Sequence, residues 1–512
     1  MMCHRQKAYV VAFLLALPFF AAFPIAPVMA AAEVSCIGGA SGRECGPRVL
    51  PEITSKAAIL QFIDQSGAEL GETVSRLFWR ETLNAISDMR GRGVILATGL
   101  DRQLEMMRRF GANPLEMLRG GYHGAALKIS DVLGTSMAAW GGVATEADAI
   151  LLYAFLSMTP EHPSNALVVT LGPSQVRPDT LPVAQLQLRF DRLAFPPQEA
   201  RPAHLFRGPI LLRCNLDAGC PQGVPVFRGP GEDTLRIRGL AEGTSVTVIE
   251  ARGKWLQLRL PDDRVGWTNI YHLDFAPIAV SAPVSVRPSS SPGASPSSSL
   301  ISFSQPRPVL EMRRVGNRRW YRIMVEGGRT GWISDAQVEP FHRIPGVHML
   351  AGIYRLGAGQ NERAEREFRA FLDSADPDTD DTSERLTVSA ALQLIALARA
   401  RKIIASGIKA ERHSEVEEPL GKAALLTPFD PGLWALRAAL LLMIDPDRPE
   451  RAFEALRRAL TLDPDQPDVR AFSDALAIAV VHRPQQLARM GLLAERVATL
   501  VALLPQPGTP PR

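Results

Sequence analysis

The sequence has little excess charge and no dense basic segment. Its 57 Lys and Arg residues are nearly balanced by 53 Asp and Glu residues, so the formal net charge is only +4. No cluster of Lys or Arg with interleaved aromatic residues is present. Binding to a nucleic-acid backbone depends on clustered cations that neutralise phosphates. We therefore expect no nucleic-acid partner.

Common catalytic motifs are also missing. The chain has no Gly-x-Ser-x-Gly elbow, no His-Glu-x-x-His pattern and no phosphate-binding Gly-Lys-Ser/Thr loop. His123 and Asp131 could pair, but a lone His after a Gly-Gly-Tyr turn is more typical of a structural residue. A hydrolase that uses Cys36 or Cys45 as its nucleophile would require those thiols to be reduced. We predict that the protein is not an enzyme, and we expect no cofactor and no metal.

Cysteine is scarce, with 5 residues in a chain of 512. Cys3 lies near the N-terminus, and the other four form two close pairs, Cys36 with Cys45 and Cys214 with Cys220. An even number of cysteines in an exported protein predicts disulfides, although four cysteines permit three connectivities. Pairing within each close pair is our first expectation. Zinc is disfavoured because neither pair has the short gap of a zinc site and no histidine lies close by.

The N-terminus is typical of a secretory signal peptide, which we assign to residues 1–30. A basic start precedes an apolar stretch over residues 8–26, and small residues permit cleavage after Ala30 or after Ala32. An uncleaved N-terminal anchor is the alternative, because the apolar stretch is nearly long enough to span a bilayer. We expect no other membrane-spanning segment. The predicted location is periplasmic or secreted.

An internal repeat lies in the middle of the chain. Residues 255–267 read WLQLRLPDDRVGW and residues 320–332 read WYRIMVEGGRTGW, so both tryptophans, an arginine and a glycine align. Apolar residues alternate after the first tryptophan of each copy, and a pair of turn residues follows. This pattern predicts a β-hairpin with an aromatic residue at each end.

The first copy, from Val224-Pro225-Val226 through Arg228-Gly229-Pro230-Gly231 to Trp255, closely resembles bacterial SH3-like domains. The second copy starts at Val284, where a Ser/Pro-rich stretch over residues 288–299 replaces the Gly-Pro-Gly turn and is either a loop or a linker.

The resemblance implies two small β-barrels, over residues 220–276 and 280–340, that bind cell-wall peptides or proteins. Tryptophans of such a barrel favour a core role over ligand stacking. The exposed candidates for ligand contact are Arg228, Arg264 and Tyr271, and the full candidate set also includes Trp267 and Trp332.

From about residue 346 the composition shifts to Ala, Leu, Arg and Glu with apolar residues at helical spacing. Trp434, Ala438 and Leu441 suit the first helix of a tetratricopeptide repeat. The second helix and terminal proline are matched by Ala452, Leu456, Ala459 and Pro464. The resemblance implies a repeat domain over residues 346–505, whose concave surface holds a protein partner. A purely structural or dimerising domain is the alternative.

The N-terminal segment, residues 31–205, alternates turns, strands and helices and is predicted to be α/β. Residues 88–117, with Tyr122, Ala126-Leu127 and Asp131 following, resemble the central lobe of TRAP-transporter solute receptors. In those receptors an arginine clamps the substrate carboxylate, but Ile95 stands at that position here. A degenerate α/β domain retained for packing or contact is therefore favoured over a ligand-binding lobe.

Taken together, the sequence predicts a multidomain α+β protein: an N-terminal α/β segment, two SH3-like barrels and a C-terminal helical-repeat domain. We expect an exported, non-enzymatic adaptor of the bacterial cell envelope. Its partners would be a cell-wall peptide or envelope protein at the β modules and a protein on the helical repeats. The alternatives are a solute-binding accessory protein and a cell-wall hydrolase with an unrecognised active site.

Overall fold

A computed structural model of the chain describes residues 57–86, 123–130, 135–158, 167–171, 183–190, 192–207, 210–214, 220–274, 277–279, 284–285, 287, 300–301, 307–315, 318–325, 329–334, 337–376, 379–407 and 412–505. The predicted signal peptide, Cys36, Cys45 and Asp131 lie outside these residues, as do residues 88–117, which carry most of the solute-receptor resemblance.

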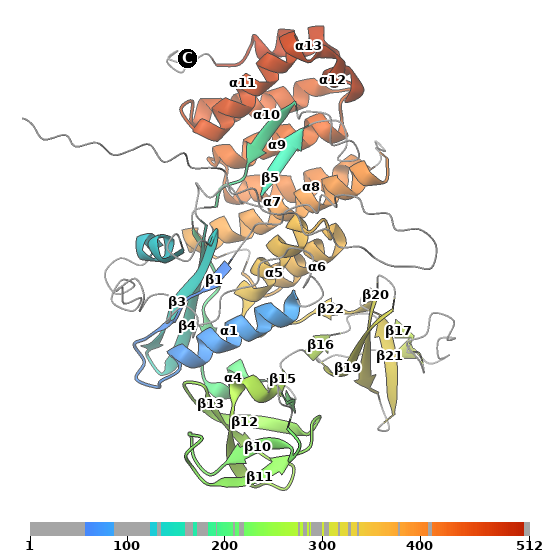
Figure 1. The fold of residues 1–512 in the computed structure, drawn as a ribbon. Coiled ribbons are helices and arrows are strands. Elements are labelled where there is room, and N and C mark those ends of the chain that lie inside the picture. Colours follow the sequence, from blue (N-terminus) through green and yellow to red (C-terminus); the bar gives the residue numbers. More distant parts are fainter. Residues whose placement is uncertain are drawn as a thin grey trace, which may run out of the picture. The chain divides into compact units, whose positions relative to one another are not determined.

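The described residues form a mixed α+β protein, with sheets in the N-terminal half and a run of helices at the C-terminal end (Figure 1). This confirms the predicted α+β class. No helix within the described ranges combines enough length with enough apolar character to cross a membrane.

The first sheet joins segments that are far apart in sequence. Its main path runs β1 (Ala57–Ile59), β3 (Met137–Glu146), β4 (Ala149–Met158) and β7 (Arg192–Ala194). The short β2 (Ile63–Asp64) pairs with β3, and β8 (Gln198–Glu199) pairs with β4. β1 and β2 run parallel to β3, whereas the β3–β4 hairpin is antiparallel. The sheet is therefore mixed.

Helix α1 (Gly71–Ala85) follows β2 and contacts this sheet. Its apolar residues Val74, Leu77 and Phe78 are completely buried and recur at helical spacing, so they form one core-facing stripe. The carboxylate of Asp64 accepts hydrogen bonds from the backbone N–H groups of Leu70 and Gly71 at the start of the helix. These bonds fix the loop that leads into α1.

The second sheet contains seven strands in the order β11-β10-β14-β13-β12-β9-β15. Their bounds are β9 (Ile210–Leu212), β10 (Val224–Phe227), β11 (Arg236–Leu240), β12 (Ser245–Arg252), β13 (Trp255–Arg259), β14 (Val265–Asn269) and β15 (Leu273–Asp274). A 3-10 turn, η2 (Ile270–His272), connects β14 to β15.

The third sheet contains five strands in the order β21-β20-β19-β16-β22. Their bounds are β16 (Pro277–Ala279), β19 (Arg307–Val315), β20 (Arg318–Met324), β21 (Thr330–Ser334) and β22 (Glu339–Pro340). The short strands β17 (Val284–Ser285) and β18 (Leu300–Ile301) pair with each other.

The five-strand order of the third sheet repeats within the second sheet as β14-β13-β12-β9-β15. The register also repeats: Gln257 pairs with Trp267 in one hairpin, and Arg322 pairs with Trp332 in the other. Both predicted hairpins are therefore confirmed. The strand before each hairpin has a register shift at the equivalent place, between Val248 and Glu250 and between Val309 and Glu311. The first strand of each sheet, β9 or β16, lies before the starts predicted at residues 220 and 280.

The C-terminal run consists of α5 (Pro345–Gly357), α6 (Asn361–Leu372), α7 (Thr382–Ala405), α8 (His413–Leu426), α9 (Pro431–Ile444), α10 (Pro449–Leu462), α11 (Pro467–His482), α12 (Pro484–Arg489) and α13 (Ala494–Val501). Five of these described helices begin at proline, which suits the first helical turn because its missing N–H has no partner there. Consecutive helices from α5 to α11 contact one another.

A small sheet from the N-terminal half packs against the helical run. A two-stranded sheet, β5 (Val168–Leu171) with β6 (Ala184–Gln187), contacts α9 and α11 (Figure 1). Leu186 and Leu188 are buried. The Arg189 Nε lies 2.6 Å from an Asp468 carboxylate oxygen on α11. One side of helices α9 and α11 is thus covered by β5 and β6.

Candidate functional site

The two tryptophans among the predicted ligand contacts are core residues. Trp267 and Trp332 are each only 5% exposed. Phe227 pairs with Trp267 across the sheet and places its ring edge-on to Trp255, with centroids 5.6 Å apart. At the third sheet, Arg287 forms an isolated backbone β-bridge with Trp332. The Arg287 guanidinium carbon lies 4.9 Å from the Trp320 ring centroid. The core interpretation of the tryptophans therefore fits their burial.

Arg228 and Arg264 are exposed, as expected. The Arg264 Nη2 lies 2.9 Å from an Asp262 carboxylate oxygen, and Arg238 approaches the same carboxylate at 3.1 Å. Desolvation works against ionisation there, but the hydrogen bond from Arg264 and the charge of Arg238 outweigh it and lower the pKa of Asp262. Arg264 thus belongs to a surface ion-pair group on the β13–β14 turn.

Tyr271, also expected on the surface, is half-buried against α1. Its hydroxyl accepts a hydrogen bond from Arg76, and its ring is edge-on to Trp79 at a centroid distance of 6.0 Å. Tyr271 therefore joins the second sheet (β9–β15), which we call the first β module, to α1. The sequence did not predict this contact.

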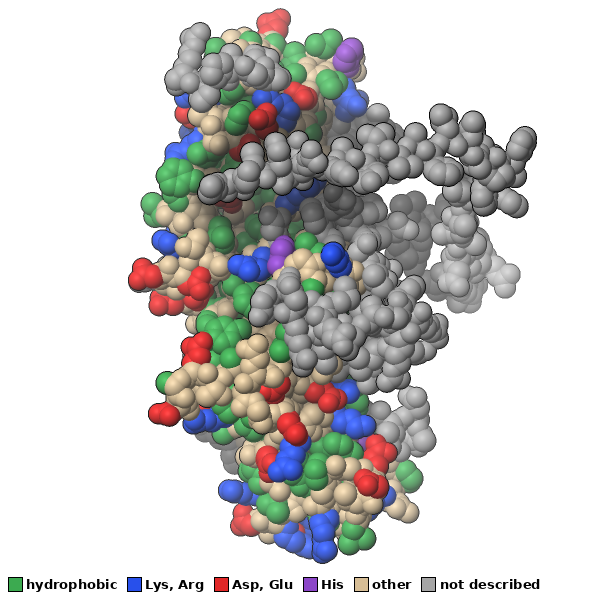
Figure 2. All heavy atoms as spheres, turned by 90° about the vertical axis from the view of Figure 1, so that its left-hand side faces the viewer, with side chains coloured by type: hydrophobic (Ala, Val, Ile, Leu, Met, Phe, Trp, Pro, Cys, Tyr) green, Lys and Arg blue, Asp and Glu red, His purple; other side chains and the backbone are tan. Residues whose placement is uncertain are grey.

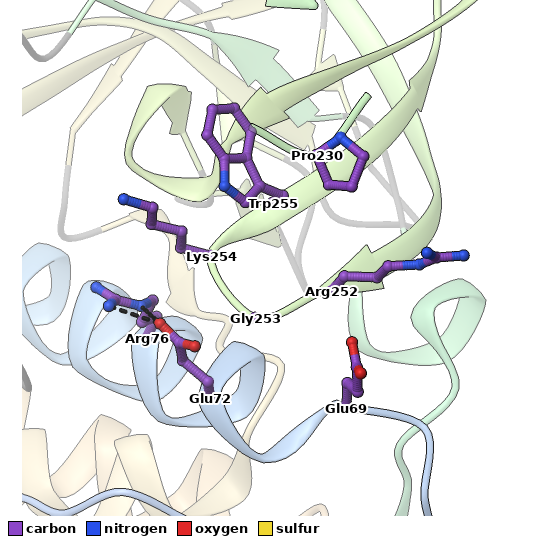
Figure 3. Close-up of a pocket in the computed structure, with 8 residues that line it drawn as sticks. All are labelled: Glu69, Glu72, Arg76, Pro230, Arg252, Gly253, Lys254 and Trp255. Carbon is purple, nitrogen blue, oxygen red and sulfur yellow. Dashed lines mark hydrogen bonds and ion pairs between the residues drawn. The ribbon is translucent and has the colours of Figure 1, made fainter. Parts of the chain in front are cut away.

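This junction borders a pocket of about 540 Å³ (Figure 3). The lining residues come from the loop before α1, from α1 itself, and from the first β module: Glu69, Glu72, Arg76, Pro230, Arg252, Gly253, Lys254 and Trp255. A neighbouring pocket of about 340 Å³ shares Glu69, Glu72 and Gly253.

Two backbone segments are tied together at the base of the pocket. The Gly253 N–H donates to the Glu69 carbonyl at 3.3 Å, and the Thr73 hydroxyl donates to the Gly253 carbonyl at 2.7 Å. Glu69 has a φ of 56° and Gly253 a φ of 55°, both in the left-handed region. A Cβ on Gly253 would also lie 2.8 Å from the Glu72 carboxylate. Position 253 therefore favours glycine for its backbone conformation, and the Glu72 side chain would have to shift to admit a Cβ there.

The charges of the pocket fall into two groups. Arg76 pairs with Glu72 at 2.7 Å, and Arg252 pairs with Glu250 at 2.7 Å. Lys254 and Glu69 have no ion-pair partner among the described residues, and the Lys254 ammonium lies 6.0 Å from the Trp255 ring centroid. In Figure 3 Lys254 extends from one side of the Gly253 turn, and Glu69, from the loop before α1, lies on the other side. The lining of the pocket thus includes one cation and one anion, on opposite sides of the turn.

Beyond this pocket, the visible face is electrically mixed. Figure 2 shows basic and acidic side chains interspersed over the described residues of that face. This distribution agrees with the near balance of 57 cationic and 53 anionic residues in the sequence.

A second polar cluster lies within the helical domain. His342, His348 and Glu367 bring three potential metal-ligand atoms within 4.8 Å of one another. The His348 Nδ1 lies 2.9 Å from the Glu367 carboxylate, whereas its Nε2 accepts a hydrogen bond from the His342 backbone N–H at 3.2 Å. A metal on Nδ1 would require a proton on Nε2, which already faces a donor. The arrangement therefore suits a structural histidine better than a metal ligand.

The remaining chemical candidates also have structural partners. His123 Nδ1 lies 2.8 Å from the Ser157 hydroxyl, which also accepts a hydrogen bond from Trp140 at 2.8 Å. Cys214 and Cys220 form a disulfide with a Cα–Cα distance of 5.8 Å, which confirms local pairing for this pair.

No family model matches the sequence, and no curated protein sequence matches it.

Proposed function

We propose that the protein is an exported, non-enzymatic adaptor of the bacterial cell envelope, with two SH3-like modules and a tetratricopeptide-like helical domain. The observation that carries the proposal is the repeated β module. Two sheets share a five-strand order, the pairing of their tryptophans and the position of a register shift. Two copies of a small binding module in one chain favour attachment to a repetitive ligand such as the cell wall.

The disulfide supports an exported location. Cys214 and Cys220 are bonded, and disulfides persist mainly in oxidising compartments such as the periplasm or the extracellular space. The predicted signal peptide at residues 1–30 leads to the same compartment.

The helical domain supports a contact role, but its partner needs a free face. Helices α9 and α11 are covered on one side by β5 and β6, so an extended partner cannot use that side without displacing them. Leu425 and Phe429, at the junction of α8 and α9, are 84% and 80% exposed. We propose this junction as the protein-contact surface of the helical domain, because the two most exposed large apolar side chains of the described residues lie only four positions apart there.

The test is cosedimentation of the mature chain, beginning at Ala31, with purified peptidoglycan sacculi. Point variants are preferable to deletion of a module, because Tyr271 and Gly253 hold the first module against α1. Arg228→Glu and Arg264→Glu alter exposed module residues, and Arg457→Glu on α10 provides a control of equal charge change.

We expect the wild-type chain and the Arg457→Glu control to sediment with sacculi, and the module variants to sediment less. If the wild-type chain stays in the supernatant, wall binding is wrong, and the two modules are protein-contact or structural domains. If it sediments and every variant sediments equally, binding does not involve the exposed arginines.

A further inference from the structure

We propose that the junction of α8 and α9 binds an acidic segment of a partner protein. Arg458 on α10 holds a carboxylate of that segment, and Leu425 and Phe429 are covered by its apolar side chains. This inference deepens the proposed contact role of the helical domain, on which it rests, by naming the chemistry of the partner.

Arg458 is the arginine on α9 and α10 that lacks a carboxylate. The other three pair with acidic residues: Arg437 and Arg451 with Glu417, and Arg457 with Glu454. Arg458 is exposed, and among the described residues it has neither an ion-pair nor a hydrogen-bond partner. Its guanidinium N–H donors are therefore available to a ligand.

Trp434 holds this cation in place. The Arg458 guanidinium carbon lies 3.9 Å from the centroid of the Trp434 ring. Trp434 is only 8% exposed, and its Nε1 donates a hydrogen bond of 3.0 Å to the Pro428 carbonyl oxygen. A guanidinium can lie on an aromatic ring and still offer its planar fork to a carboxylate. Because the side chain is already positioned, binding costs less rotamer entropy than at an unsupported surface arginine.

The cation and the apolar side chains are within reach of one short segment. Pro428 directly precedes Phe429, so the Trp434 ring and one peptide unit connect Arg458 to that residue. These contacts limit the distance from the Arg458 guanidinium carbon to the Phe429 backbone nitrogen to about 12 Å. An extended chain covers that distance in about four residues. A carboxylate and an apolar side chain at such a spacing can contact both.

This surface lies away from the side of α9 that β5 and β6 cover. Asp430 and Gly432 line a small pocket together with residues of β6. Trp434 follows Gly432 by two positions, which is a rotation of about 200° around the helix. A partner at Trp434 and Arg458 therefore does not need to displace β5 and β6.

Charge complementarity favours a partner protein over a second copy of this chain. In a symmetric dimer the same surface would face itself. The carboxylates on α8 and α10 already have cationic partners: Glu415, Glu417, Glu418, Glu450 and Glu454. A second copy thus has no spare carboxylate on these helices for Arg458, whereas an acidic segment brings its own.

The test measures the binding of heptapeptides to the full mature chain by fluorescence polarisation. Each peptide carries a neutral dye on its N-terminus and an amide at its C-terminus, and has Leu and Phe residues within four positions of a single Glu. Matched peptides replace the Glu by Gln, or the Leu and Phe by Ala. We expect the Glu peptides with apolar residues to bind at least about tenfold more tightly than either matched set.

Three variants separate the two parts of the site. Arg458→Gln should weaken the Glu peptides by about tenfold and leave the Gln peptides unchanged. Phe429→Ser should weaken both. Arg489→Gln is the control, because Arg489 is an exposed cation on α12 without an ion-pair partner among the described residues. It should change neither.

The inference is overturned if no peptide binds, or if Arg458→Gln keeps the full preference for Glu over Gln. If Glu and Gln peptides bind equally and Phe429→Ser weakens both, the carboxylate site is wrong, but the junction remains the contact surface of the proposed function. Sedimentation equilibrium of the chain tests the other occupant. A dimer that Phe429→Ser dissociates would place a second copy on this surface and would also overturn the inference.

Discussion

Glu81 of α1 and Arg343, two residues before α5, form an ion pair in which both side chains are completely buried. Their Oε1 and Nη1 atoms are 3.0 Å apart. The other carboxylate oxygen of Glu81 accepts the Arg343 backbone N–H at 2.8 Å. The pair connects segments 262 residues apart, so α1 and the helical run share one hydrogen-bonded core.

Glu81→Ala should be severely destabilising, because it leaves the buried guanidinium of Arg343 without its carboxylate. Removing one partner of a buried ion pair typically costs about 3–5 kcal/mol. Urea unfolding followed by circular dichroism measures the loss. The exposed pair of Glu454 with Arg457 supplies the control, since Glu454→Ala should cost no more than about 1 kcal/mol. Equal effects from the two substitutions would contradict the assignment.

Replacing Cys214 and Cys220 together with serine should destabilise the first β module by about 2 kcal/mol. The disulfide closes a sequence separation of only 6 residues, and short loops lose less entropy when they are closed than long loops do. The measurement is urea unfolding of the variant beside the wild type, with and without reductant. Reductant should shift the wild type more than the variant, which keeps only the Cys36 and Cys45 pair. Peptide mapping that joins either cysteine to Cys36 or Cys45 would show a different connectivity.

Gly352→Ala should be destabilising, because a Cβ there would overlap the ring of Phe368 on α6. Phe368 is completely buried and has little freedom to move, so overpacking should cost about 1–3 kcal/mol. Gly421 on α8 is the matched control, since a Cβ there meets no atom within 4 Å. Gly421→Ala should raise stability by about 0.5–1 kcal/mol through its helix propensity. Thermal melts of the two variants should therefore shift in opposite directions.

Acidification should destabilise the helical domain through His348. Burial lowers the pKa of His348 below its ordinary 6.5, with the charge of His342 acting in the same sense and Glu367 opposing them. The folded histidine therefore stays neutral where the unfolded chain takes up a proton, so stability falls as the pH drops below 6.5. His272, whose pKa burial also lowers, contributes in the same pH range.

The test compares melting temperatures across this range for the wild type and His348→Gln. The variant should be less stable near neutral pH but should lose less stability on acidification. Glu367 adds a separate loss at lower pH. Although burial opposes it, the hydrogen bonds from His342 and His348 lower the pKa of Glu367, so its contribution disappears as the pH falls below its ordinary 4.5. An unchanged slope in His348→Gln would show that the histidine does not titrate on unfolding.

The spacing of residues in the sequence correctly predicted elements whose residues lie close together in the chain. The alternation after Trp255 and Trp320 predicted both hairpins, because side chains on a strand repeat every second residue. Trp434 and Leu456 were expected on two neighbouring helices, and they lie buried on α9 and α10. Cys214 and Cys220 are six residues apart and paired as predicted.

Contacts between distant segments were not predictable in this way. Lys254 follows a glycine in a turn, which gives a weak signal for a site, but nothing in the sequence near Glu69 indicates that it faces the same pocket. Tyr271 was expected to be exposed because its partner, Arg76, is 195 residues away. β9 and β16 are three-residue strands, too short for an alternation pattern to identify.

The paired sheets also record how the chain arose. Strand order, tryptophan pairing and the site of the register shift agree between the two modules, whereas Phe227 in one is replaced by Arg287 in the other. Tandem duplication of one ancestral gene segment accounts for the shared features together.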